Sequence, residues 1–456
     1  MKKKDHLIRL IAGMLAISSF AMCTKNNIEK PSPTTEAASS NIKTQAVSIF
    51  TYTVKPSDWM VDGTNIPAGA TIFIPAGTRG SLLFKNLKGT AAAPITITNQ
   101  GGKAILTTSV TASYGFKTQN CSNFKVIGTG TASVKNGLVV NGGNIGMTMD
   151  DLSTDFEIAG VEVCNSGFAG IMAKTDPSCD PATWRGHFTM KNVFVHNNYV
   201  HKTGGEGLYI GNSFYADGVS LSCGTVLPHD IVNAKIYANF VDSTGSEGIQ
   251  VGSAVSGCEI YNNMVVNPGM SPFSAYQDNG IQIGEGTGGK CYNNLISNAP
   301  GNGIIVLGLG NNQVFNNYIL NSKSYGIFAD SRYTPGPYFQ FVNNAIINSQ
   351  LGGIKLNSET IPMNTVINNV IVQSGGSSLA IIRKSTSVKL TALNNYITND
   401  VNNVKYVNYN AGNFHLLSSS PLIKAGQNTT AYGVSFDYFS NARPPLSAFD
   451  IGAAKY

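Results

Sequence analysis

A short phrase that recurs along the chain constrains its fold more than any other feature. Residues Thr203–Ser213 read TGGEGLYIGNS, and the phrase returns as TGSEGIQVGSA and again within QDNGIQIGEG. A second series repeats with it, in which an asparagine precedes apolar residues, as in IYNNMV and CYNNLI. From Asn239 onward its members lie 24, 31, 23, 27, 25 and 26 residues apart. The members of this series are Asn198, Asn239, Asn263, Asn294, Asn317, Asn344, Asn369 and Asn395.

Short alternating apolar segments with a period near 24 residues predict an all-β solenoid. Each period would be one coil, and strands of successive coils would stack in parallel about 4.8 Å apart. The asparagines would then form a ladder, each amide bonding its neighbours above and below. Charged residues are only 12% and glycines number 49, which also favours repetitive β structure over helices. We expect one solenoid domain over residues 49–456.

At this point the pattern resembles the right-handed parallel β-helix family, the pectate-lyase-like superfamily. The stretch IPAGATIFIPAGTRGSLLFKNLKG resembles the N-terminal segment that caps the first coil of secreted members, and SSPLIKAGQ with NARPPLSAFDIGAAKY resembles their usual ending. The resemblance implies a polysaccharide partner, but the family includes lyases, hydrolases, epimerases and non-enzymatic adhesins. The catalytic motifs of polygalacturonases, mannuronan epimerases and chondroitinase-B-like lyases are absent, so no family residue can be carried over.

The residue that varies between the repeated phrases, which is Tyr209 in the first of them, is predicted to point outward. Leu208 and Ile210 would face the core by strand alternation, so Tyr209 would face out. The equivalent positions hold Gln250, Gln282, Ile305, Phe328 and Lys355. Together with Tyr209 these residues would form an outward-facing stripe along the solenoid. Long coils flank the stripe, with insertions at Asn212–Asp230 and at GMSPFSAYQ. Aromatic rings and amides suit a groove for a sugar chain, and the alternative is an ordinary protein surface.

Two carboxylates precede the stripe in successive coils. Glu206 and Glu247 align, so their backbones would lie roughly 5 Å apart, near the carboxyl separation of retaining glycosidases. Strict alternation would point Glu206 inward with Leu208, although alternation fails at turns and the glycine-rich lead-in predicts one. The alternative is a turn-stabilising ladder in which these glutamates cap backbone amides.

We assign His201 as a candidate base beside Tyr209, because histidine titrates near neutral pH. The predicted catalytic residues are therefore Glu206, Glu247, Tyr209 and His201. Substrate contacts are assigned to Gln250, Gln282, Lys174 and Glu285, of which Lys174, with Asp176 close by in the sequence, could contact an acidic sugar.

The cysteines and acidic clusters give no firm metal site. No Cys-x-x-Cys or His-x-x-x-His spacing is present. An exported location permits disulfides, and Cys164 with Cys179 is the predicted pair. The segment MDDLSTDFE carries Asp150, Asp151 and Glu157 and could bind calcium, as several β-helix lyases do, but it lacks the order of a dedicated calcium loop and a solvated loop is the favoured interpretation.

The N-terminus predicts export. Three lysines lead into a short apolar run that ends near Cys23, so residues 1–23 are interpreted as a signal peptide of the lipoprotein type, with Cys23 lipidated, against ordinary cleavage nearby. Residues 24–48 are predicted to be a flexible tether at the outer membrane or cell surface. The net charge of +6 lies partly in the signal, so no nucleic-acid partner is inferred.

The sequence therefore leaves two classes of function open. The first is an exported polysaccharide lyase or glycoside hydrolase. The second is a non-catalytic glycan-binding or adhesive surface protein, which would keep the stripe but need no convergent titratable groups. Convergence of Tyr209, Glu206 and Glu247 with a histidine in one groove would favour the enzyme.

Overall fold

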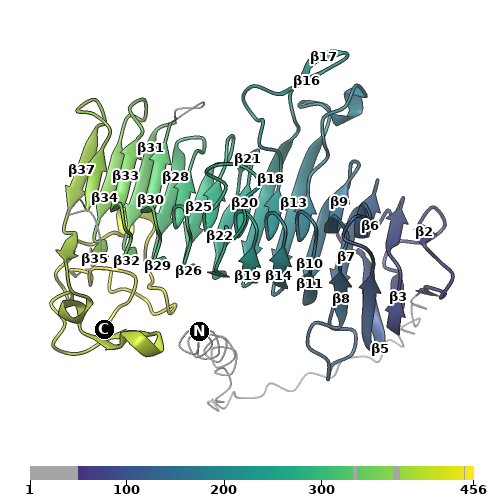
Figure 1. Ribbon diagram of the computed structural model, residues 1–456, viewed down its shortest axis with the longest axis horizontal. Coiled ribbons are helices and arrows are strands. Elements are labelled where there is room, and N and C mark those ends of the chain that lie inside the picture. The colour runs from purple at the N-terminus through teal and green to yellow at the C-terminus, as the bar shows by residue number, and fades with distance from the viewer. Residues whose placement is uncertain (1–49, 332–335, 373–379, 446) are drawn as a thin grey trace, which may run out of the picture.

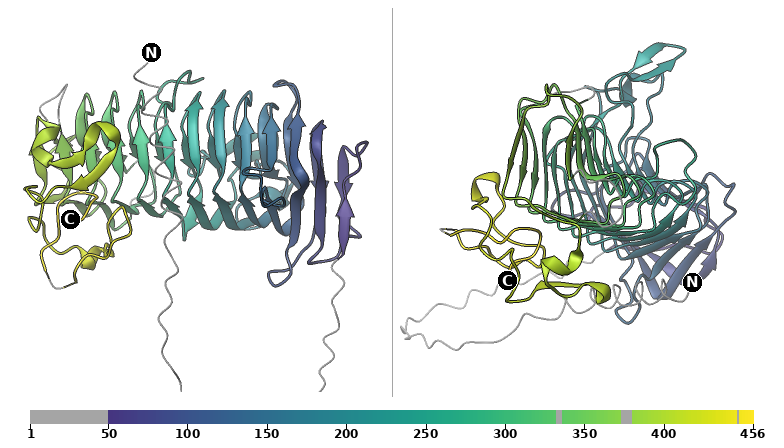
Figure 2. Two further views of the ribbon diagram at one scale, coloured as in Figure 1. Left: turned by 90° about the horizontal axis from the view of Figure 1, so that it is seen from below. Right: turned by 60° about the vertical axis from the view of Figure 1, so that its left-hand side comes forward.

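The computed structural model describes residues 50–331, 336–372, 380–445 and 447–456. Within them the chain winds into a single solenoid of short parallel strands, which stack along the long axis of the molecule (Figures 1 and 2). The predicted right-handed parallel β-helix is confirmed. The predicted signal peptide, Cys23 and tether lie outside the described residues.

Each coil contributes strands to three faces of the solenoid. The first and second faces join into one 24-stranded sheet at the N-terminal end, where β1 (Thr51–Thr53), β3 (Thr71–Arg79) and β5 (Ile95–Thr107) lie, and the third face is a separate 12-stranded sheet.

The strands of the first face are β7 (Ser122–Ile127), β10 (Thr154–Ala159), β13 (Thr189–His196), β18 (Asp230–Tyr237), β21 (Ala254–Ser256), β22 (Glu259–Tyr261), β25 (Gly289–Tyr292), β28 (Asn311–Phe315), β31 (Tyr338–Val342), β34 (Asn364–Ile367) and β37 (Leu390–Leu393). Those of the second face are β8 (Leu138–Asn141), β11 (Val161–Cys164), β14 (Tyr199–Thr203), β19 (Phe240–Thr244), β23 (Met264–Val266), β26 (Leu295–Ser297), β29 (Tyr318–Leu320), β32 (Ala345–Ile347), β35 (Val370–Val372) and β38 (Tyr396–Thr398). Those of the third face are β2 (Met60–Asp62), β4 (Leu82–Lys85), β6 (Tyr114–Gln119), β9 (Ile145–Asp150), β12 (Ile171–Ala173), β15 (Leu208–Ile210), β20 (Ile249–Val251), β24 (Ile281–Ile283), β27 (Ile304–Val306), β30 (Tyr325–Asp330), β33 (Gly352–Asn357) and β36 (Ile381–Arg383).

Four further strands and four short 3₁₀ helices lie outside these faces in the described part of the chain. They are β16 (Val219–Leu221), β17 (Gly224–Val226), β39 (Tyr406–Asn408), β40 (Asn413–Leu416), η1 (Pro181–Thr183), η2 (Val401–Val404), η3 (Tyr409–Ala411) and η4 (Thr430–Tyr432). The N-terminal cap consists of β1 and β2, which form the outermost rung of the two sheets.

The predicted asparagine ladder is confirmed and runs inside the turn between the first and second faces. Asn294, which is fully buried, receives bonds from the backbone N–H and Nδ2 of Asn263, at 3.0 Å each. It donates in turn to Oδ1 of Asn317 at 2.9 Å and to the carbonyl of Ile260 at 2.9 Å. The same pattern links the other members down to Asn395. The ladder therefore satisfies polar groups that the turn buries.

The first asparagine of each Asn-Asn pair has a different task. Asn293 and Asn316 have a φ of 54°, in the left-handed region that asparagine tolerates better than most residues. That conformation turns the chain sharply, and the second asparagine then enters the ladder. The Asn-Asn pair in the repeat thus provides both the turn and the hydrogen bonds that stabilise it.

The insertion at Asn212–Asp230 projects from the solenoid and carries the antiparallel hairpin β16–β17 (Figure 1). A disulfide between Cys179 and Cys223 ties it to the preceding coil. The predicted Cys164–Cys179 bond is wrong, because Cys164 lies in β11 on the second face as a free, buried thiol. The partner was missed because Cys223 belongs to an insertion, whose path the repeat does not determine.

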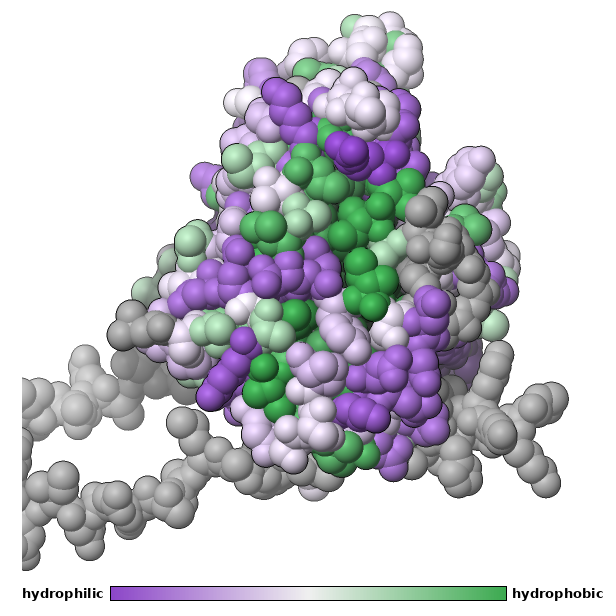
Figure 3. All heavy atoms as spheres, turned by 90° about the vertical axis from the view of Figure 1, so that its left-hand side faces the viewer, coloured by the Kyte–Doolittle hydropathy of each residue, from purple (hydrophilic) through white to green (hydrophobic). Residues whose placement is uncertain are grey.

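The C-terminal segment after β38 packs back on the second face. Tyr406 and Phe414 belong to one apolar cluster with Tyr318, and Arg443 is buried and donates to the carbonyls of Asp450 and Gly452. Figure 3 views the C-terminal end of the solenoid, where apolar side chains are interspersed with polar ones; Leu393 and Ile397 in the last coil are exposed. Among the described residues, no helix has the length and apolar character needed to cross a membrane.

Candidate functional site

The candidate site lies on the outer surface of the third face, at strands β12, β15 and β20. Strand pairing puts Tyr209 opposite Gln250, and Gln250 opposite Gln282, so the predicted outward stripe exists. It continues through Ile305, Phe328 and Lys355. The stripe is not an open surface at this point, because Tyr209 is only 7% exposed and Gln250 only 2%.

A lysine ammonium lies over the Tyr209 ring. Nζ of Lys174 is 4.8 Å from the ring centroid and 2.7 Å from Oδ1 of Asp176. Burial acts to lower the pKa of Lys174, but Tyr209, Asp176 and Glu206 outweigh it and raise the pKa overall. The ammonium therefore stays charged. Lys174 and Tyr209 are therefore in contact, and their roles in binding a sugar stay a prediction.

Ser213, a residue of the insertion that the repeat pattern does not single out, connects two residues of the stripe. Oγ of Ser213 lies 2.8 Å from the hydroxyl of Tyr209 and accepts a bond from Nε2 of Gln250 at 2.7 Å. Ser213 itself is partly exposed. The other amide atom of Gln250, Oε1, is buried without a hydrogen-bond partner. The start of the insertion thus covers Tyr209 and Gln250 and leaves Oε1 of Gln250 without a hydrogen-bond donor.

Glu206 and Glu247 lie in equivalent turns just before β15 and β20. The carbonyl of Glu206 accepts from Gly170 N–H, and that of Glu247 accepts from Gly207 N–H, so the two residues stand on adjacent rungs. A Cβ added at Gly207 would meet the core residue Val241. Because Gly207 and Leu208 both face inward, alternation breaks between them, and Glu206 points to the outer side. Strict alternation would point the Glu206 side chain inward, and that expectation is therefore wrong.

Both carboxyl groups are almost completely buried and incompletely bonded. Glu206 is 1% exposed and Glu247 is 0% exposed, and Oε2 of each has no hydrogen-bond partner. Oε1 of Glu247 accepts from Nδ2 of Asn279 at 3.0 Å. This bond gives Glu247 a part in a turn ladder that continues to Asn302, as the alternative interpretation expected. Because Oε2 of each glutamate lacks a hydrogen-bond partner, the turn engages only one oxygen of each carboxyl group.

Burial raises the pKa values of these groups into the neutral range. The pKa of Glu206 rises to about 7, with Lys174 acting in the opposite direction. The pKa of Glu247 rises to about 8, and the negative charges of Glu206 and Asp278 add to the effect of burial. Burial also raises the pKa of the Tyr209 phenol, so Tyr209 stays protonated near neutral pH and is poorly suited to act as a base.

An aromatic path leads from Tyr209 to the surface. Phe168 makes an edge contact with Tyr209, at 6.2 Å between ring centroids, and another with Phe273, at 5.6 Å. Phe273 is 59% exposed, and Tyr276 on the same insertion is 87% exposed. Since the faces of aromatic rings stack on sugar rings, this rim suits a carbohydrate chain.

The expectation that His201 stands beside Tyr209 is wrong. His201 lies in β14 on the second face, where it stacks on Tyr199 at 4.1 Å. The histidine at the candidate site is His229, whose Nε2 accepts from the N–H of Thr175 at 3.0 Å. Burial lowers its pKa to about 4, so it is neutral and holds the chain next to Lys174. The repeat could not place it, because His229 lies at the end of the insertion.

The remaining predicted residues lie around this centre or apart from it. Gln282 and Glu285 are half-buried in the next coil, in β24 and in the turn after it. The acidic segment considered for calcium does not converge, since Asp150 and Asp151 both pair with Lys117 at 3.0 Å and Glu157 pairs with Lys125. These partners explain the segment without a cation.

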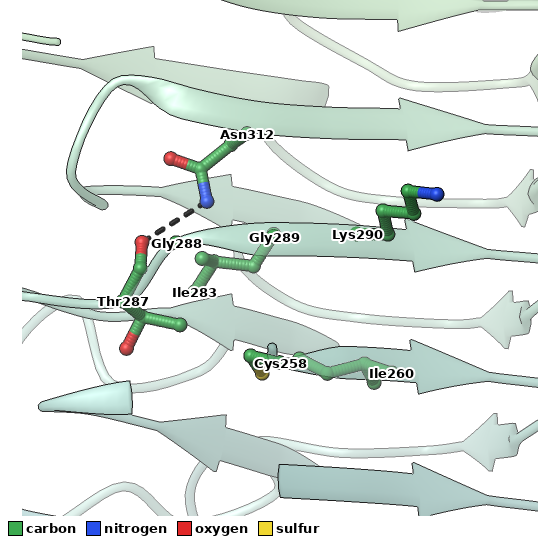
Figure 4. Close-up of a pocket in the computed structure, with 8 residues that line it drawn as sticks. All are labelled: Cys258, Ile260, Ile283, Thr287, Gly288, Gly289, Lys290 and Asn312. Atoms are coloured by element: carbon green, nitrogen blue, oxygen red, sulfur yellow. Dashed lines mark hydrogen bonds between the residues drawn. The ribbon is translucent and has the colours of Figure 1, made fainter. Parts of the chain in front are cut away.

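A small interior space lies elsewhere in the solenoid and is shown in Figure 4. Cys258, Ile260 and Ile283 line it with the turn at Thr287, whose carbonyl accepts from Nδ2 of Asn312 at 3.0 Å. It has no room for a water molecule and is a packing gap under a turn. The candidate site is therefore defined by its residues and not by an open pocket.

The raised pKa values of Glu206 and Glu247 predict a dependence of stability on pH. The folded chain holds these protons above the usual pKa of 4.5, so the free energy of unfolding should fall as pH rises from about 4.5 through 8. His229 opposes this below its usual pKa of 6.5, because its folded pKa is lowered. Chemical unfolding between pH 6.5 and 8 should show the fall in the native chain and a flatter curve in a Glu206→Gln, Glu247→Gln double variant. Equal slopes would contradict it.

Comparison with known proteins agrees with the fold. The family model described as a right-handed β-helix region matches residues 217–402. Among solved structures, XylC in complex with xylose is 10% identical, with 86% of this chain and 94% of that chain covered and a TM-score of 0.51. Pectate lyase Pel9A is 16% identical, with 86% and 89% covered and a TM-score of 0.47. No curated protein matches the chain significantly.

The stacked parallel strands and the family match together identify the chain as a right-handed parallel β-helix protein. At 10% identity, the structural likeness to XylC establishes the fold alone.

Proposed function

We propose that this protein binds a polysaccharide across the outer surface of the third face and hydrolyses it. The observation that carries the proposal is the pair of buried carboxyl groups on adjacent rungs, Glu206 and Glu247, each with one oxygen that lacks a partner. Leaving such groups unpaired costs free energy, which a bound sugar hydroxyl or glycosidic oxygen would offset. The xylose bound to the structurally similar XylC supports a carbohydrate as the class of ligand.

The electrostatics give the two carboxyl groups different roles. Lys174 favours the ionised form of Glu206, which suits a nucleophile at the anomeric carbon. Glu206 and Asp278 disfavour ionisation of Glu247, which suits an acid that protonates the leaving oxygen and later acts as the base. Adjacent rungs are about 4.8 Å apart, near the roughly 5–5.5 Å carboxyl separation of retaining glycosidases. We therefore propose hydrolysis with retention of configuration.

Access to Tyr209 and Gln250 requires movement of the segment that covers them, the beginning of the insertion. Ser213 is hydrogen-bonded to both Tyr209 and Gln250 and is the partly exposed residue above them. In the proposal, a sugar that stacks on Phe273 and Phe168 takes over the bonds of Ser213 as it enters. The Cys179–Cys223 disulfide anchors the far end of the insertion, so only its beginning moves.

A second candidate function is a polysaccharide lyase. The observation that favours it is the buried ammonium of Lys174, which could neutralise the carboxylate of a uronate sugar. Its weakness is the base, since burial raises the pKa of Tyr209 and His229 has both ring nitrogens engaged. The lyase is therefore the less favoured reaction.

The test is an incubation of residues 49–456 with a panel of acidic and neutral polysaccharides, following new reducing ends and ultraviolet absorbance of unsaturated uronates in parallel. We expect reducing ends without the absorbance, which means hydrolysis. Both signals together would establish the lyase and overturn the hydrolase. Retained binding on a glycan array without either signal, on every polysaccharide bound, would overturn both reactions and favour the adhesive protein.

We also propose that the chain is exported and anchored to the outer membrane or cell surface through a lipid on Cys23, because residues 1–23 have the features of a lipoprotein signal. The mass of the mature chain made in a host with the lipoprotein pathway tests this. A chain that begins at another residue and carries no lipid would contradict it.

A further inference from the structure

A cluster of metal-binding side chains lies on the second face, separate from the site on the third face. Glu162, Cys164 and His201 each offer a donor atom, and these atoms all lie within 4.8 Å of one another. They are the one such group of three in the part of the chain that the structure describes. Nothing in the proposed hydrolysis uses any of them.

The backbone that holds this cluster is rigid. Glu162 and Cys164 project to the same side of β11, and His201 lies opposite Cys164 on the neighbouring strand β14. The next rung places Asp242 opposite His201, so a thiol, an imidazole and a carboxylate follow one another along the stack. A site on paired strands keeps its geometry better than one on a loop.

The side chains are already oriented toward a common point. Nε2 of His201 lies 3.3 Å from Oε1 of Glu162, and stacking on Tyr199 holds the imidazole ring. Cys164 is 7% exposed and is a free thiol. Tetrahedral zinc takes sulfur at about 2.3 Å and nitrogen or oxygen at about 2.0–2.2 Å, which requires donor atoms about 3.3–3.8 Å apart. The Glu162–His201 distance meets this already, and a small contraction brings in the sulfur.

We propose that Glu162, Cys164 and His201 bind one divalent transition-metal ion of the zinc type, with water as the fourth ligand. Thiolate, imidazole and carboxylate are the ligands that zinc takes in proteins, whereas calcium and magnesium prefer oxygen alone. A thiolate and one carboxylate balance the charge of a divalent ion. Lys103 lies 3.4 Å from Oε2 of Glu162, which leaves Oε1, the oxygen beside His201, for the metal.

The ion would join two coils of the solenoid. β11 and β14 belong to consecutive coils, and β14 leads directly into the turn that carries Glu206. A metal on these strands would therefore stabilise the rungs on which the third-face site is built.

Titration of residues 49–456 with Co²⁺, without thiol reductant, tests the proposal because cobalt bound to a thiolate has a charge-transfer absorption in the near ultraviolet. We expect that band to saturate at one equivalent in the native chain. Cys164→Ser should abolish the band, and His201→Ala should weaken binding at least tenfold. Zinc should displace the cobalt and raise the melting temperature of the native chain but not of Cys164→Ser.

The matched control is His196→Ala. His196 bonds to Glu157 at 3.2 Å on the first face, as His201 bonds to Glu162, but no cysteine lies with that pair in the described residues. Binding by this variant should equal that of the native chain. Absence of a saturable thiolate band in the native chain, or a band that persists in Cys164→Ser, would overturn the proposal.

Discussion

Replacing Glu247 with Gln is expected to lower the rate of polysaccharide hydrolysis at least about 100-fold, because the amide cannot give a proton to the leaving oxygen. Glu206→Gln should cause a loss of similar size by removing the nucleophile. The substrate is the polysaccharide that the panel identifies, and the measurement is the initial rate of reducing-end release. Gln has nearly the shape of Glu, so the bond from Asn279 to Oε1 of Glu247 can be kept.

The pH profile of the native enzyme should be bell-shaped. Activity requires an ionised Glu206, with a pKa of about 7, and a protonated Glu247, with a pKa of about 8. The rate should therefore rise through the first value and fall through the second. A profile of this form that disappears in the Gln variants links the loss of rate to proton transfer and not to misfolding.

The control for this experiment is Glu259→Gln. Glu259 is a partly buried carboxylate on the first face, paired with Lys235 at 2.7 Å and bonded to Tyr292, so it has no part in the third-face site. Its substitution should leave the rate unchanged. If Glu247→Gln hydrolyses as fast as the native chain while its melting temperature shows that it is folded, the assignment of the acid is wrong.

The second large effect is expected in the asparagine ladder. Asn294→Ala removes the acceptor of both Asn263 donors. It also removes the Nδ2 donor to Oδ1 of Asn317 and to the carbonyl of Ile260, while the backbone N–H of residue 294 still donates to Oδ1 of Asn317. Each buried polar group left unpaired costs about 1–3 kcal/mol, so we expect the free energy of unfolding to fall by at least about 3 kcal/mol. Urea unfolding followed by circular dichroism measures the change.

Gln340→Ala is the matched control for the ladder. Oε1 of Gln340 accepts from Nε2 of Gln313 at 2.7 Å, but both side chains are partly exposed on the first face. Water can replace that bond, so the loss should stay near 1 kcal/mol or less. A loss in Asn294→Ala no larger than in this control would mean that the ladder contributes little to stability.

Prediction from the sequence succeeded where the repeat applies. The register of Tyr209, Gln250 and Gln282, the ladder from Asn198 to Asn395 and the site of the insertion all follow from the spacing of aligned residues. A parallel solenoid stacks equivalent positions directly, so alignment along the chain becomes adjacency in space.

Prediction failed where the chain departs from the repeat. Cys223, Ser213 and His229 belong to the insertion or follow it directly, and their positions depend on how that segment folds over β15. His201 was assigned to the wrong surface because closeness in sequence to Tyr209 was taken for closeness in space, whereas the turn between β14 and β15 separates their faces.

The repeat alone specifies the architecture, because a chain with a period near 24 residues and alternating apolar positions buries its apolar side chains by coiling into a solenoid. It also determined which residues share a column on each face. The outward direction of Glu206, which depends on a glycine that breaks the alternation, and the burial of both carboxyl groups became evident from the three-dimensional fold. Their proton affinity near neutral pH arises from that burial, which depends on contacts between segments distant in the chain and is absent from the local pattern of residues.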